Sequence, residues 1–483
     1  MSKTSKNEQK IAVIDIGSNS IRLVIFDRYG RYPYPLFNER ITCRLGADLK
    51  KTKMLRVDRI EHALLTIKRF SSIVKTAKLK NVHAIGTAAS RNAKNANDFL
   101  MPAEKLLGFK IKVLSGDEEA NLVADGLLSN IPDASGVIAD LGGGSVELIR
   151  VQNGLVKNTI SLNFGHLSDL SEQKIITEIK KLNWLKMKSS EFFYGVGGSF
   201  RALGLIYKHK RKYPIDLLHG LTIPVKRTKR IFKKIIEGDV ILKGLPSSRK
   251  DSMPNAAKIM KLILNESKAK NLIICGTSVR DGVVLQTIPH SNGHNDPLLM
   301  TCKEIANQTQ RFRGTSVNLE KLLKPLIKIG SKKNLKRLLK AACLLSDICW
   351  NEHTDSRAFL AAERVLLLPI NSITHRERAW LAEALFYRYG RQFELQKFPF
   401  KFSEVLSYKD QLEARTIGLS LRFAMTFSAG LPELLKNVKI RMDRQNLHVI
   451  FSGDAKEIFA DHINSRLTLL SYALERELII NFN

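Results

Sequence analysis

The chain has 483 residues, enough for roughly three or four domains, and its hydrophobic content of 44% allows sizeable cores. Its 78 Lys and Arg residues exceed its 46 Asp and Glu residues, giving a formal net charge of +32. This excess indicates a polyanionic partner, namely nucleic acid, polyphosphate or an anionic membrane, or else only a generally basic, soluble surface. No membrane span is predicted, because no run approaches the roughly 18 apolar residues that a span needs.

The five cysteines are scattered without a CxxC pair, so we predict reduced thiols in a cytoplasmic protein. The apolar stretch near the N-terminus is interrupted by Asp15 and Arg22, which is not typical of a signal peptide.

Residues 11–27, IAVIDIGSNSIRLVIFD, predict a β-hairpin, because two apolar strand signals flank a turn of small residues. The turn contains Ser18 and Asn19, and Asp15 stands just before it. Consecutive amide groups in such a turn form a concavity suited to an anion.

Residues 136–151, GVIADLGGGSVELIRV, predict a second hairpin, with Asp140 before its turn and Glu147 after it. Glycine lets a backbone approach a ligand closely. Acids beside an anion site are favourable if Mg²⁺ lies between carboxylate and phosphate. The turn residues are Gly142, Gly143, Gly144 and Ser145.

The two hairpins align without a gap, which indicates an internal duplication. Facing each other across a cleft, the two turns would hold a phosphate chain from both sides. The alternative is a pair of ordinary tight hairpins, and the match between the copies makes this the weaker interpretation. The aligned pairs are Asp15 with Asp140, Gly17 with Gly142, Ser20 with Ser145, and Arg22 with Glu147.

Between the hairpins, the apolar spacing predicts a helix over Val57–Thr76, after a mixed, turn-rich segment at residues 31–53. A short strand at residues 81–85 ends in a small-residue turn that leads to Arg91. A helix is expected at residues 97–106 and a strand at residues 110–114.

Three acids, Asp117, Glu118 and Glu119, lie where that strand meets a helix predicted over residues 120–128. Acids at this position are often plain N-terminal helix charge. A carboxylate at a strand end facing the cleft could instead be a general base for water. The residue types do not choose among the three.

After the second hairpin, a strand at residues 191–194 leads through Gly195-Val196-Gly197-Gly198-Ser199 into a helix at residues 200–207. A glycine-rich turn at a helix N-terminus is a further anion or nucleotide site, here with Gly197 and Gly198 as phosphate-binding candidates. Phe200 replaces the third glycine of GxGxxG, and no GxxxxGK[ST] motif occurs, so a P-loop NTPase is disfavoured. A buried strand is expected at residues 271–275, and a polar linker at residues 289–297.

Beyond the linker the composition becomes helical and basic. Residues 321–340 carry many cations around an apolar stripe, which predicts either a solvated helical face or the wall of a polyanion channel. Further helices are expected at residues 341–350, 357–368 and 375–389. The tail predicts two strands, a helix and a last strand, at residues 438–442, 447–451, 455–474 and 478–482. The cations are Lys321, Lys324, Lys328, Lys332, Lys333, Lys336, Arg337 and Lys340.

Several spaced motifs resemble the exopolyphosphatase / guanosine pentaphosphate phosphohydrolase family: DIGSNS at residues 15–20, GT at residues 86–87 with Arg91, SGDEEA at residues 115–120, DLGGGSVE at residues 140–147, and GVGGS at residues 195–199. The resemblance is strong over residues 11–290 and weaker from about residue 300. It implies an α/β fold with two ribonuclease H-like lobes of the actin–sugar kinase–Hsp70 type, followed by a helical HD-like domain and a small α/β unit. The corresponding ranges are 1–130, 131–298, 299–430 and 431–483.

The resemblance also implies roles for individual residues. Glu119 would be the general base for the attacking water, and Arg91 would contact the phosphate under attack. Asp140 and Glu147, both also counted as catalytic, would help to bind Mg²⁺ or position water, and Asp15 would be a further acid beside the metal. A homodimer is a further family expectation. The phosphate-cradling residues would be Ser18, Asn19, Gly142, Gly143, Gly144 and Ser145.

One departure concerns the helical domain, which in longer relatives resembles HD-type phosphohydrolases. No His-Asp dipeptide occurs in this chain, and Leu345-Ser346-Asp347 stands where one is expected. A metal site needs its ligands, so a non-catalytic polyphosphate wall or dimer contact is predicted. His353, Asp355 and His375 could be ligands, but solvated or capping roles are favoured.

The leading hypothesis is a Mg²⁺-dependent exopolyphosphatase that releases terminal phosphate. The sequence does not separate it from hydrolysis of guanosine pentaphosphate to the tetraphosphate. A non-catalytic polyanion binder is disfavoured by the acids Glu119, Asp140 and Glu147, and nucleic acid is a possible but not favoured partner. A sugar kinase-like ATPase ranks low, because no second-substrate domain is identifiable.

Overall fold

The structure is a computed structural model that describes residues 10–27, 35–168, 170–238, 242–287, 296–327, 333–369, 372–390 and 400–483. It divides into two compact units. The first consists of Met1–Tyr213 and Leu217–Asn292, and the second of Pro214–Asp216 and Gly293–Asn483. Most of the predicted linker at residues 289–297, and both Lys328 and Lys332, lie outside the described residues.

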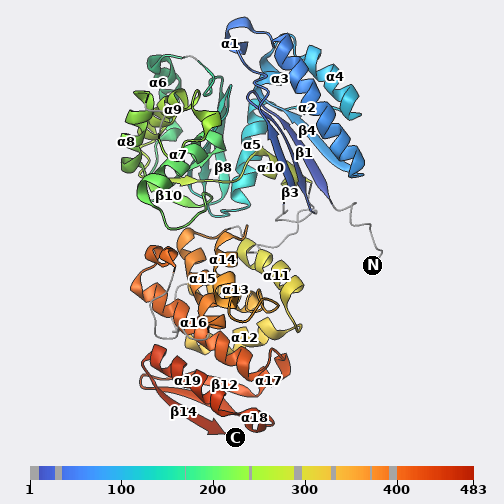
Figure 1. Cartoon of the computed structure of the whole chain (residues 1–483). Helices are drawn as coiled ribbons and strands as arrows, with labels where there is room; N and C mark the ends of the chain where they lie inside the picture. Colours follow the sequence, from blue (N-terminus) through green and yellow to red (C-terminus); the bar gives the residue numbers. More distant parts are fainter. Residues whose placement is uncertain are drawn as a thin grey trace. The chain divides into compact units, whose positions relative to one another are not determined.

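The first unit contains two sheets (Figure 1). One has the order β3-β2-β1-β4-β5, with β1 (Ile11–Ile16), β2 (Ile21–Phe26), β3 (Pro35–Ile41), β4 (Asn81–Gly86) and β5 (Ile111–Val113). The other has the order β10-β11-β9-β6-β7-β8, with β6 (Gly136–Leu141), β7 (Val146–Gln152), β8 (Leu155–Leu162), β9 (Phe192–Val196), β10 (Leu221–Pro224) and β11 (Asn271–Ile274).

The two sheets repeat one topology. In each, three consecutive strands pair antiparallel, and two later strands then add in parallel beside the first of them. Strand β10 is an additional antiparallel edge strand of the second sheet. The internal duplication inferred from the two hairpins therefore extends over whole lobes.

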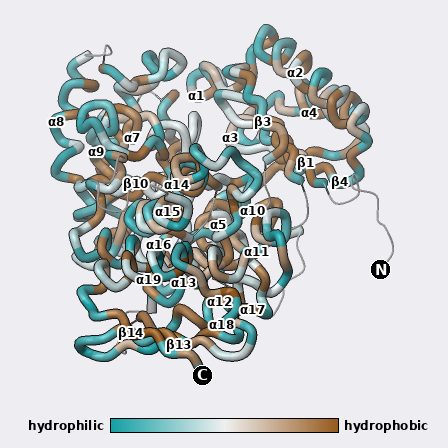
Figure 2. The backbone as a smooth tube through the Cα atoms, turned by 60° about the horizontal axis from the view of Figure 1, so that its bottom comes forward, coloured by the Kyte–Doolittle hydropathy of each residue, from teal (hydrophilic) through white to brown (hydrophobic). Residues whose placement is uncertain are grey.

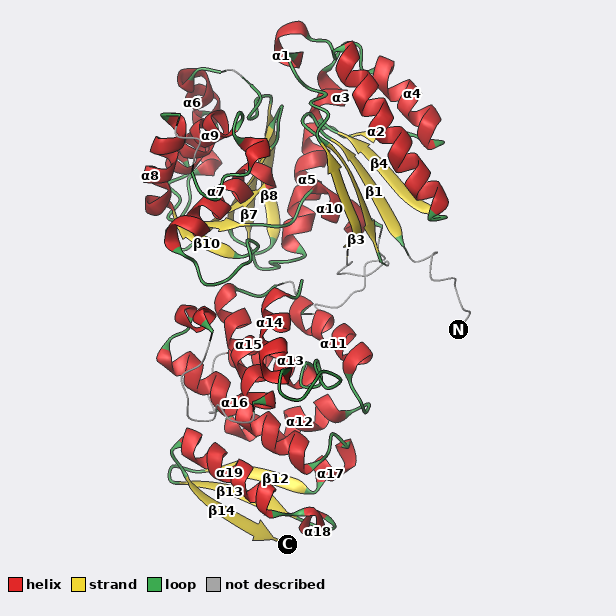
Figure 3. Cartoon of the chain, in the orientation of Figure 1, coloured by secondary structure: helices red, strands yellow, loops and turns green. Residues whose placement is uncertain are grey.

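Helices cover both faces of these sheets (Figures 1 and 3). Helices α2 and α4 pack on one face of the first sheet, α5 and α10 lie between the sheets, and α7 and α9 pack on the far face of the second. The helices are α1 (Leu49–Thr52), α2 (Val57–Thr76), α3 (Ala88–Asn92), α4 (Asn97–Leu107), α5 (Gly116–Leu128), α6 (Glu172–Lys180), α7 (Gly197–Arg211), α8 (Val225–Ile236), α9 (Met253–Glu266) and α10 (Val279–Gln286).

The sequence of strand β1 is apolar along nearly its whole length because both faces of the strand are buried. Side chains alternate between the two faces of a strand. Val13 belongs to the core between the sheets, whereas Ile14 belongs to the core under α2 and α4. A strand covered by helices on both faces has no polar face, which explains the continuous run before Asp15.

The second unit is helical and ends in a small sheet. Helix α15 (His375–Tyr389) is buried between α14 (Arg357–Leu367) and α16 (Tyr408–Phe427). The sheet has the order β12-β13-β14, with β12 antiparallel and β14 parallel to β13. The other elements are α11 (Pro297–Thr309), α12 (Thr315–Leu323), α13 (Lys333–Leu344), α17 (Pro432–Lys436), β12 (Val438–Met442), β13 (Asn446–Phe451), α18 (Ala455–Ile458), α19 (Asp461–Leu474) and β14 (Glu477–Phe482).

Several predicted elements differ from the structure. The segment predicted as turn-rich contains the edge strand β3, whose side chains are partly or fully exposed and lack an apolar alternation. The basic helix predicted over residues 321–340 is interrupted, because a 3₁₀ turn containing Pro325 follows α12. Residues 345–350 form turns instead of continuing α13, and the helix predicted over residues 455–474 is split into α18 and α19.

The fold class agrees with the prediction. The first unit consists of two α/β lobes of repeated topology, and a helical region with a small sheet follows it in the chain. Within the described ranges, none of the helices combines the length and apolar character needed to cross a bilayer.

The buried acid Glu383 in α15 makes the second unit sensitive to pH. Its side chain is 2% exposed and Oε2 has no hydrogen-bond partner in the described part of the chain. Burial raises its pKa to about 8, opposed in part by Arg415. The folded state therefore keeps a proton that the unfolded state loses above about pH 4.3, so stability falls as pH rises toward 8.

We expect Glu383→Gln to stabilise this unit at pH 8 by about 1–3 kcal/mol, with a smaller gain at pH 5, because the amide never ionises. Urea unfolding at both pH values measures the difference. The exposed acid Glu363 provides the control, since Glu363→Gln changes an already solvated group. Equal effects of Glu383→Gln at the two pH values would contradict the assignment.

Candidate active site

The two turns predicted to bind phosphate have the same construction. In β1–β2, Asp15 lies opposite Arg22, and in β6–β7, Asp140 lies opposite Glu147. The first turn is closed by the Gly17 amide, which donates to Ser20 O at 3.1 Å, and the second by the equivalent Gly142–Ser145 bond at 3.0 Å. Residues that the gapless alignment matches therefore occupy equivalent positions in the two hairpins.

A following loop holds the carbonyl groups of each turn. In the first lobe, Gly46 N donates to Ser18 O at 2.8 Å. In the second, His166 N and Leu167 N donate to the carbonyls of Gly142 and Gly143. With the carbonyls bound on one side, the turn amides are available on the other.

The two turns approach each other closely. A methyl group on Gly143 or Gly144 would lie 3.1–3.3 Å from side-chain atoms of Ser18. Among the described residues, the amides of Asn19, Gly143 and Gly144 have no hydrogen-bond acceptor. Paired turns of this kind present several N–H groups to an anion.

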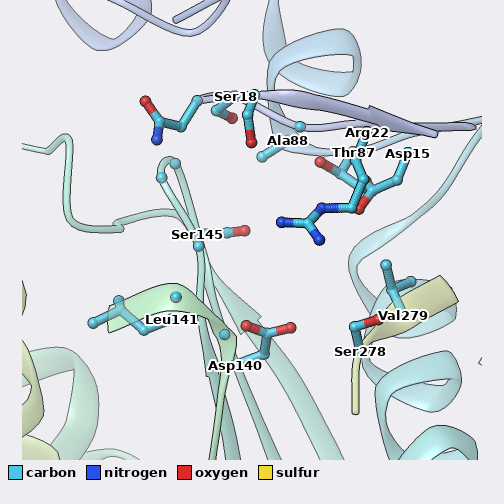
Figure 4. A pocket seen from close by; sticks show the side chains of 18 of the residues that line it. Asp15, Ser18, Arg22, Thr87, Ala88, Asp140, Leu141, Ser145, Ser278 and Val279 are labelled. Carbon is cyan, nitrogen blue, oxygen red and sulfur yellow. The ribbon is translucent and has the colours of Figure 1, made fainter. Parts of the chain in front are cut away.

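The turns border a polar cavity of about 150 Å³ in the first unit (Figure 4). Figure 4 shows the Arg22 guanidinium and the Asp140 carboxylate directed into it from different elements. Five arginines and three acids line it, and the N-terminal turns of α7 and α10 add backbone groups. The charged lining residues are Arg22, Arg40, Arg201, Arg249, Arg280, Asp15, Asp140 and Glu119.

The structure separates the three acids that the sequence left equivalent. Helix α5 begins at Gly116, four residues earlier than predicted, so all three lie in its first turn. Asp117 accepts a hydrogen bond from Thr159, and Glu118 forms the capping box with Ser115 and an ion pair with Lys112. Of these acids, only Glu119 lines the cavity.

Arg91 holds the carboxylate of Glu119. Its Nη1 donates to Glu119 Oε2 at 3.1 Å and to Leu114 O at 2.7 Å. Burial and the neighbouring Glu147 raise the pKa of Glu119 well above its usual value, whereas Arg91 opposes this rise. Arg91 is not among the residues that line the cavity, and its direct contact with phosphate stays a prediction.

The acids expected to bind Mg²⁺ occupy different environments. Burial raises the pKa of Asp140 to about 6 and that of Glu147 to about 7. Glu147 lies behind the cavity wall and accepts a hydrogen bond from Ser161 at 2.9 Å. Asp15 lines the cavity, and one of its oxygens pairs with Arg280 Nη1 at 2.5 Å.

The donor set fits Mg²⁺ only when the substrate contributes ligands. In the part of the chain that the structure describes, no three His, Cys, Asp or Glu side chains are grouped to hold a metal ion. Mg²⁺ is usually bound by one or two carboxylates together with water and substrate phosphates. Asp140, and the second oxygen of Asp15, are suitable protein ligands for such an ion.

The arginines are the main feature that the sequence did not reveal. Burial and the neighbouring arginines lower the pKa of Arg22 and Arg249 to about 10, so both stay charged at neutral pH. Their crowding costs free energy that a bound anion would offset. Guanidinium groups also match phosphate oxygens in a bidentate geometry.

Arg249 is positioned by His166 and Gly198. Its Nη1 lies 3.2 Å from His166 Nε2, which must be the acceptor because a guanidinium only donates. Burial, and then Arg249, lower the pKa of His166 to about 3, so this ring is neutral. A methyl group on Gly198 would lie 1.9 Å from Arg249 Nη2, so glycine leaves the space in which the guanidinium lies.

We therefore expect Gly198→Ala to displace Arg249 and weaken the binding of phosphorylated ligands. A hydrogen bond to a charged group contributes about 1.5–3 kcal/mol, so KM should rise roughly tenfold to a hundredfold. Arg249→Ala should have a similar effect, and the double variant should add little to it. Additive effects would show that Gly198 acts independently of Arg249.

Sequence comparisons identify the family to which the chain belongs. The sequence model described as the Ppx/GppA phosphatase family matches residues 24–291, more than half of the chain. The chain belongs to this family. A second model, described as the C-terminal region of exopolyphosphatase, matches residues 321–479. The chain is thus a Ppx/GppA phosphatase family hydrolase with the matching C-terminal region.

Individual relatives are distant. The chain is 24% identical to a guanosine-5'-triphosphate,3'-diphosphate pyrophosphatase of Aeromonas salmonicida and 25% identical to one of Aeromonas hydrophila. Each match covers 71% of this chain and 73% of the relative. An exopolyphosphatase structure from Cytophaga hutchinsonii superposes with a TM-score of 0.53 at 21% identity, covering 58% of this chain and 99% of that one. This last similarity concerns the fold.

Proposed function

We propose that this protein is a Mg²⁺-dependent exopolyphosphatase, which hydrolyses the terminal phosphoanhydride bond of inorganic polyphosphate and releases orthophosphate. The observation that carries the proposal is the cavity lined by five arginines, with the carboxylate of Glu119 beside those of Asp15 and Asp140 in its wall. At about 150 Å³ the cavity is smaller than the roughly 300–1,000 Å³ of typical small-molecule sites. Its size and polarity support recognition of the phosphate end of a substrate.

Phosphoryl transfer needs charge neutralisation, in-line positioning and an oriented nucleophile, with little covalent help from the protein. The arginines and the turn amides bind the equatorial oxygens of the terminal phosphoryl group. Glu119 accepts a proton from water, whose oxygen forms a bond to the terminal phosphorus. The bridging P–O bond breaks, and the bridging oxygen leaves with the shortened chain.

The environment of Glu119 supports its role as general base. A base is most effective when its pKa lies near the working pH. Burial and Glu147 raise the pKa of this carboxyl, while Arg91 keeps its ionised form accessible. Mg²⁺ bound with the substrate by Asp140 and Asp15 would neutralise further phosphate charge.

A second candidate is hydrolysis of guanosine pentaphosphate to the tetraphosphate, favoured by the names of the two Aeromonas relatives. In this case the triphosphate end would enter the same cavity and the nucleoside would remain outside.

Parallel assays of orthophosphate release distinguish the candidates. We expect release from long-chain polyphosphate with Mg²⁺, a loss of activity with EDTA, and a lower kcat/KM for guanosine pentaphosphate. Release from the nucleotide alone would support the second candidate. Binding of polyphosphate without release from either substrate would leave a non-catalytic polyanion binder.

A further inference from the structure

Helix α8, VKRTKRIFKKII, has one apolar face and one cationic face. Figure 2 colours the hydrophilic and hydrophobic residues along it. The apolar residues are buried in the core of the second lobe, where α8 packs on α9. Thr228 is also buried, the other six positions are cationic and exposed, and the helix contains no acid. The exposed residues are Lys226, Arg227, Lys229, Arg230, Lys233 and Lys234.

Ion pairs within the protein account for little of this charge. Lys233 lies 3.8 Å from Glu237, one turn further along. Within the described ranges, Lys226, Arg227, Lys229 and Arg230 have no acidic partner. Like charges three or four residues apart destabilise a helix, so helix stability does not explain this pattern.

The geometry of this face fits an extended polyanion. The 12 residues of α8 extend over about 18 Å, and positions three or four apart align the cations in rows along that length. Proteins that bind single-stranded nucleic acid add aromatic side chains on which bases stack. The exposed face of α8 carries no aromatic or amide side chain, so it offers cations to phosphates and no ring on which a base could stack.

We propose that the exposed face of α8 is an anchoring site for inorganic polyphosphate, which binds a stretch of the chain outside the catalytic cavity. This inference rests on the proposed exopolyphosphatase function. α8 and the cavity-lining Arg249 belong to the same lobe. A chain held at both places rebinds its new end at high effective concentration after each cleavage. Short substrates that fill only the cavity gain nothing from α8.

The test neutralises Lys226, Arg227, Lys229 and Arg230 together as glutamines. A matched control neutralises four exposed lysines of the first lobe, Lys68, Lys78, Lys94 and Lys105. Both variants lose the same charge, so nonspecific electrostatic attraction falls equally. Folding of the α8 variant is favoured, since its substitutions remove like-charge repulsion.

Binding of long-chain polyphosphate is measured as a function of salt concentration with Glu119→Gln present, so that the bound chain is not hydrolysed. Hydrolysis of long-chain polyphosphate and of tripolyphosphate is measured with Glu119 intact. Each phosphate contact contributes about 0.7 to the slope of log K against log salt, so the α8 variant should lose a slope of about 3. Its KM for long chains should rise about tenfold or more, with tripolyphosphate hydrolysis unchanged. The control should match the unaltered protein in slope.

Equal salt slopes and equal long-chain affinities for the α8 variant and the control would overturn the inference. The inference would also be overturned if the α8 variant lost binding of duplex RNA but retained binding of polyphosphate. That result would identify nucleic acid as the partner. Failure of the anchoring inference can be distinguished from failure of the proposed exopolyphosphatase function. A protein that binds long chains through α8 but hydrolyses neither substrate would refute the exopolyphosphatase function alone.

Discussion

Glu119→Gln is expected to lower kcat for phosphate release by about 10²–10⁴-fold while KM changes little, because general base catalysis typically contributes this much. The amide keeps the size of the side chain but cannot accept the proton from water. Glu119 is the one acid of the α5 first turn that lines the cavity, and Arg91 holds it in place. Steady-state kinetics on polyphosphate measure the effect.

Glu118→Gln is the matched control, because it makes the same chemical change one residue earlier. Glu118 forms the capping box of α5 and pairs with Lys112. A glutamine at this position can still accept the hydrogen bond from Ser115 N, and the exposed ion pair with Lys112 contributes little, so stability should fall by less than about 1 kcal/mol and kcat should stay largely intact. A large fall in kcat for Glu118→Gln with normal activity for Glu119→Gln would reassign the base.

Arg91→Gln should lower kcat at neutral pH by about 10–100-fold and shift the acidic limb of the pH–rate profile to higher pH. Arg91 lowers the pKa of Glu119, whereas burial and Glu147 raise it. Without the guanidinium, the pKa of Glu119 rises further, and the base becomes ionised only at higher pH. Activity should therefore recover in part as pH increases.

The pH profile distinguishes this role from direct phosphate binding. Loss of a phosphate contact would raise KM and leave the acidic limb in place. Arg91→Lys keeps the positive charge and should restore the position of the limb in part. In the Glu119→Gln background, Arg91→Gln should have little further effect, because the two residues act as a unit.

The turns and their acids could be predicted from the sequence because their signals are local. Glycine and serine between two apolar runs specify a hairpin, and β1–β2 and β6–β7 are antiparallel pairs joined by the predicted turns. Helix α2 also has the predicted bounds, since its apolar spacing is regular. Edge strand β3 lacks such a pattern, because much of its length faces solvent.

The arginine lining could not be predicted, because it is assembled from distant segments. Arg40 comes from an edge strand and Arg249 from a 3₁₀ turn, and neither segment carries a recognisable motif. Arg201 lies one turn beyond Gly197 in α7, so helical spacing after the glycine-rich turn was an available signal. The different contacts of the three acids in the first turn of α5 could not be predicted either, because they involve Thr159 and Lys112 from two strands of the fold.

Hydrolysis of long-chain polyphosphate in ¹⁸O-water tests the central claim most directly. If water activated by Glu119 attacks the terminal phosphorus, each released orthophosphate carries one oxygen from water and the shortened chain carries none. Phosphorus NMR or mass spectrometry of the products reads the position of the label. Label in the remaining chain, or short internal fragments in place of orthophosphate, would contradict terminal hydrolysis in this cavity.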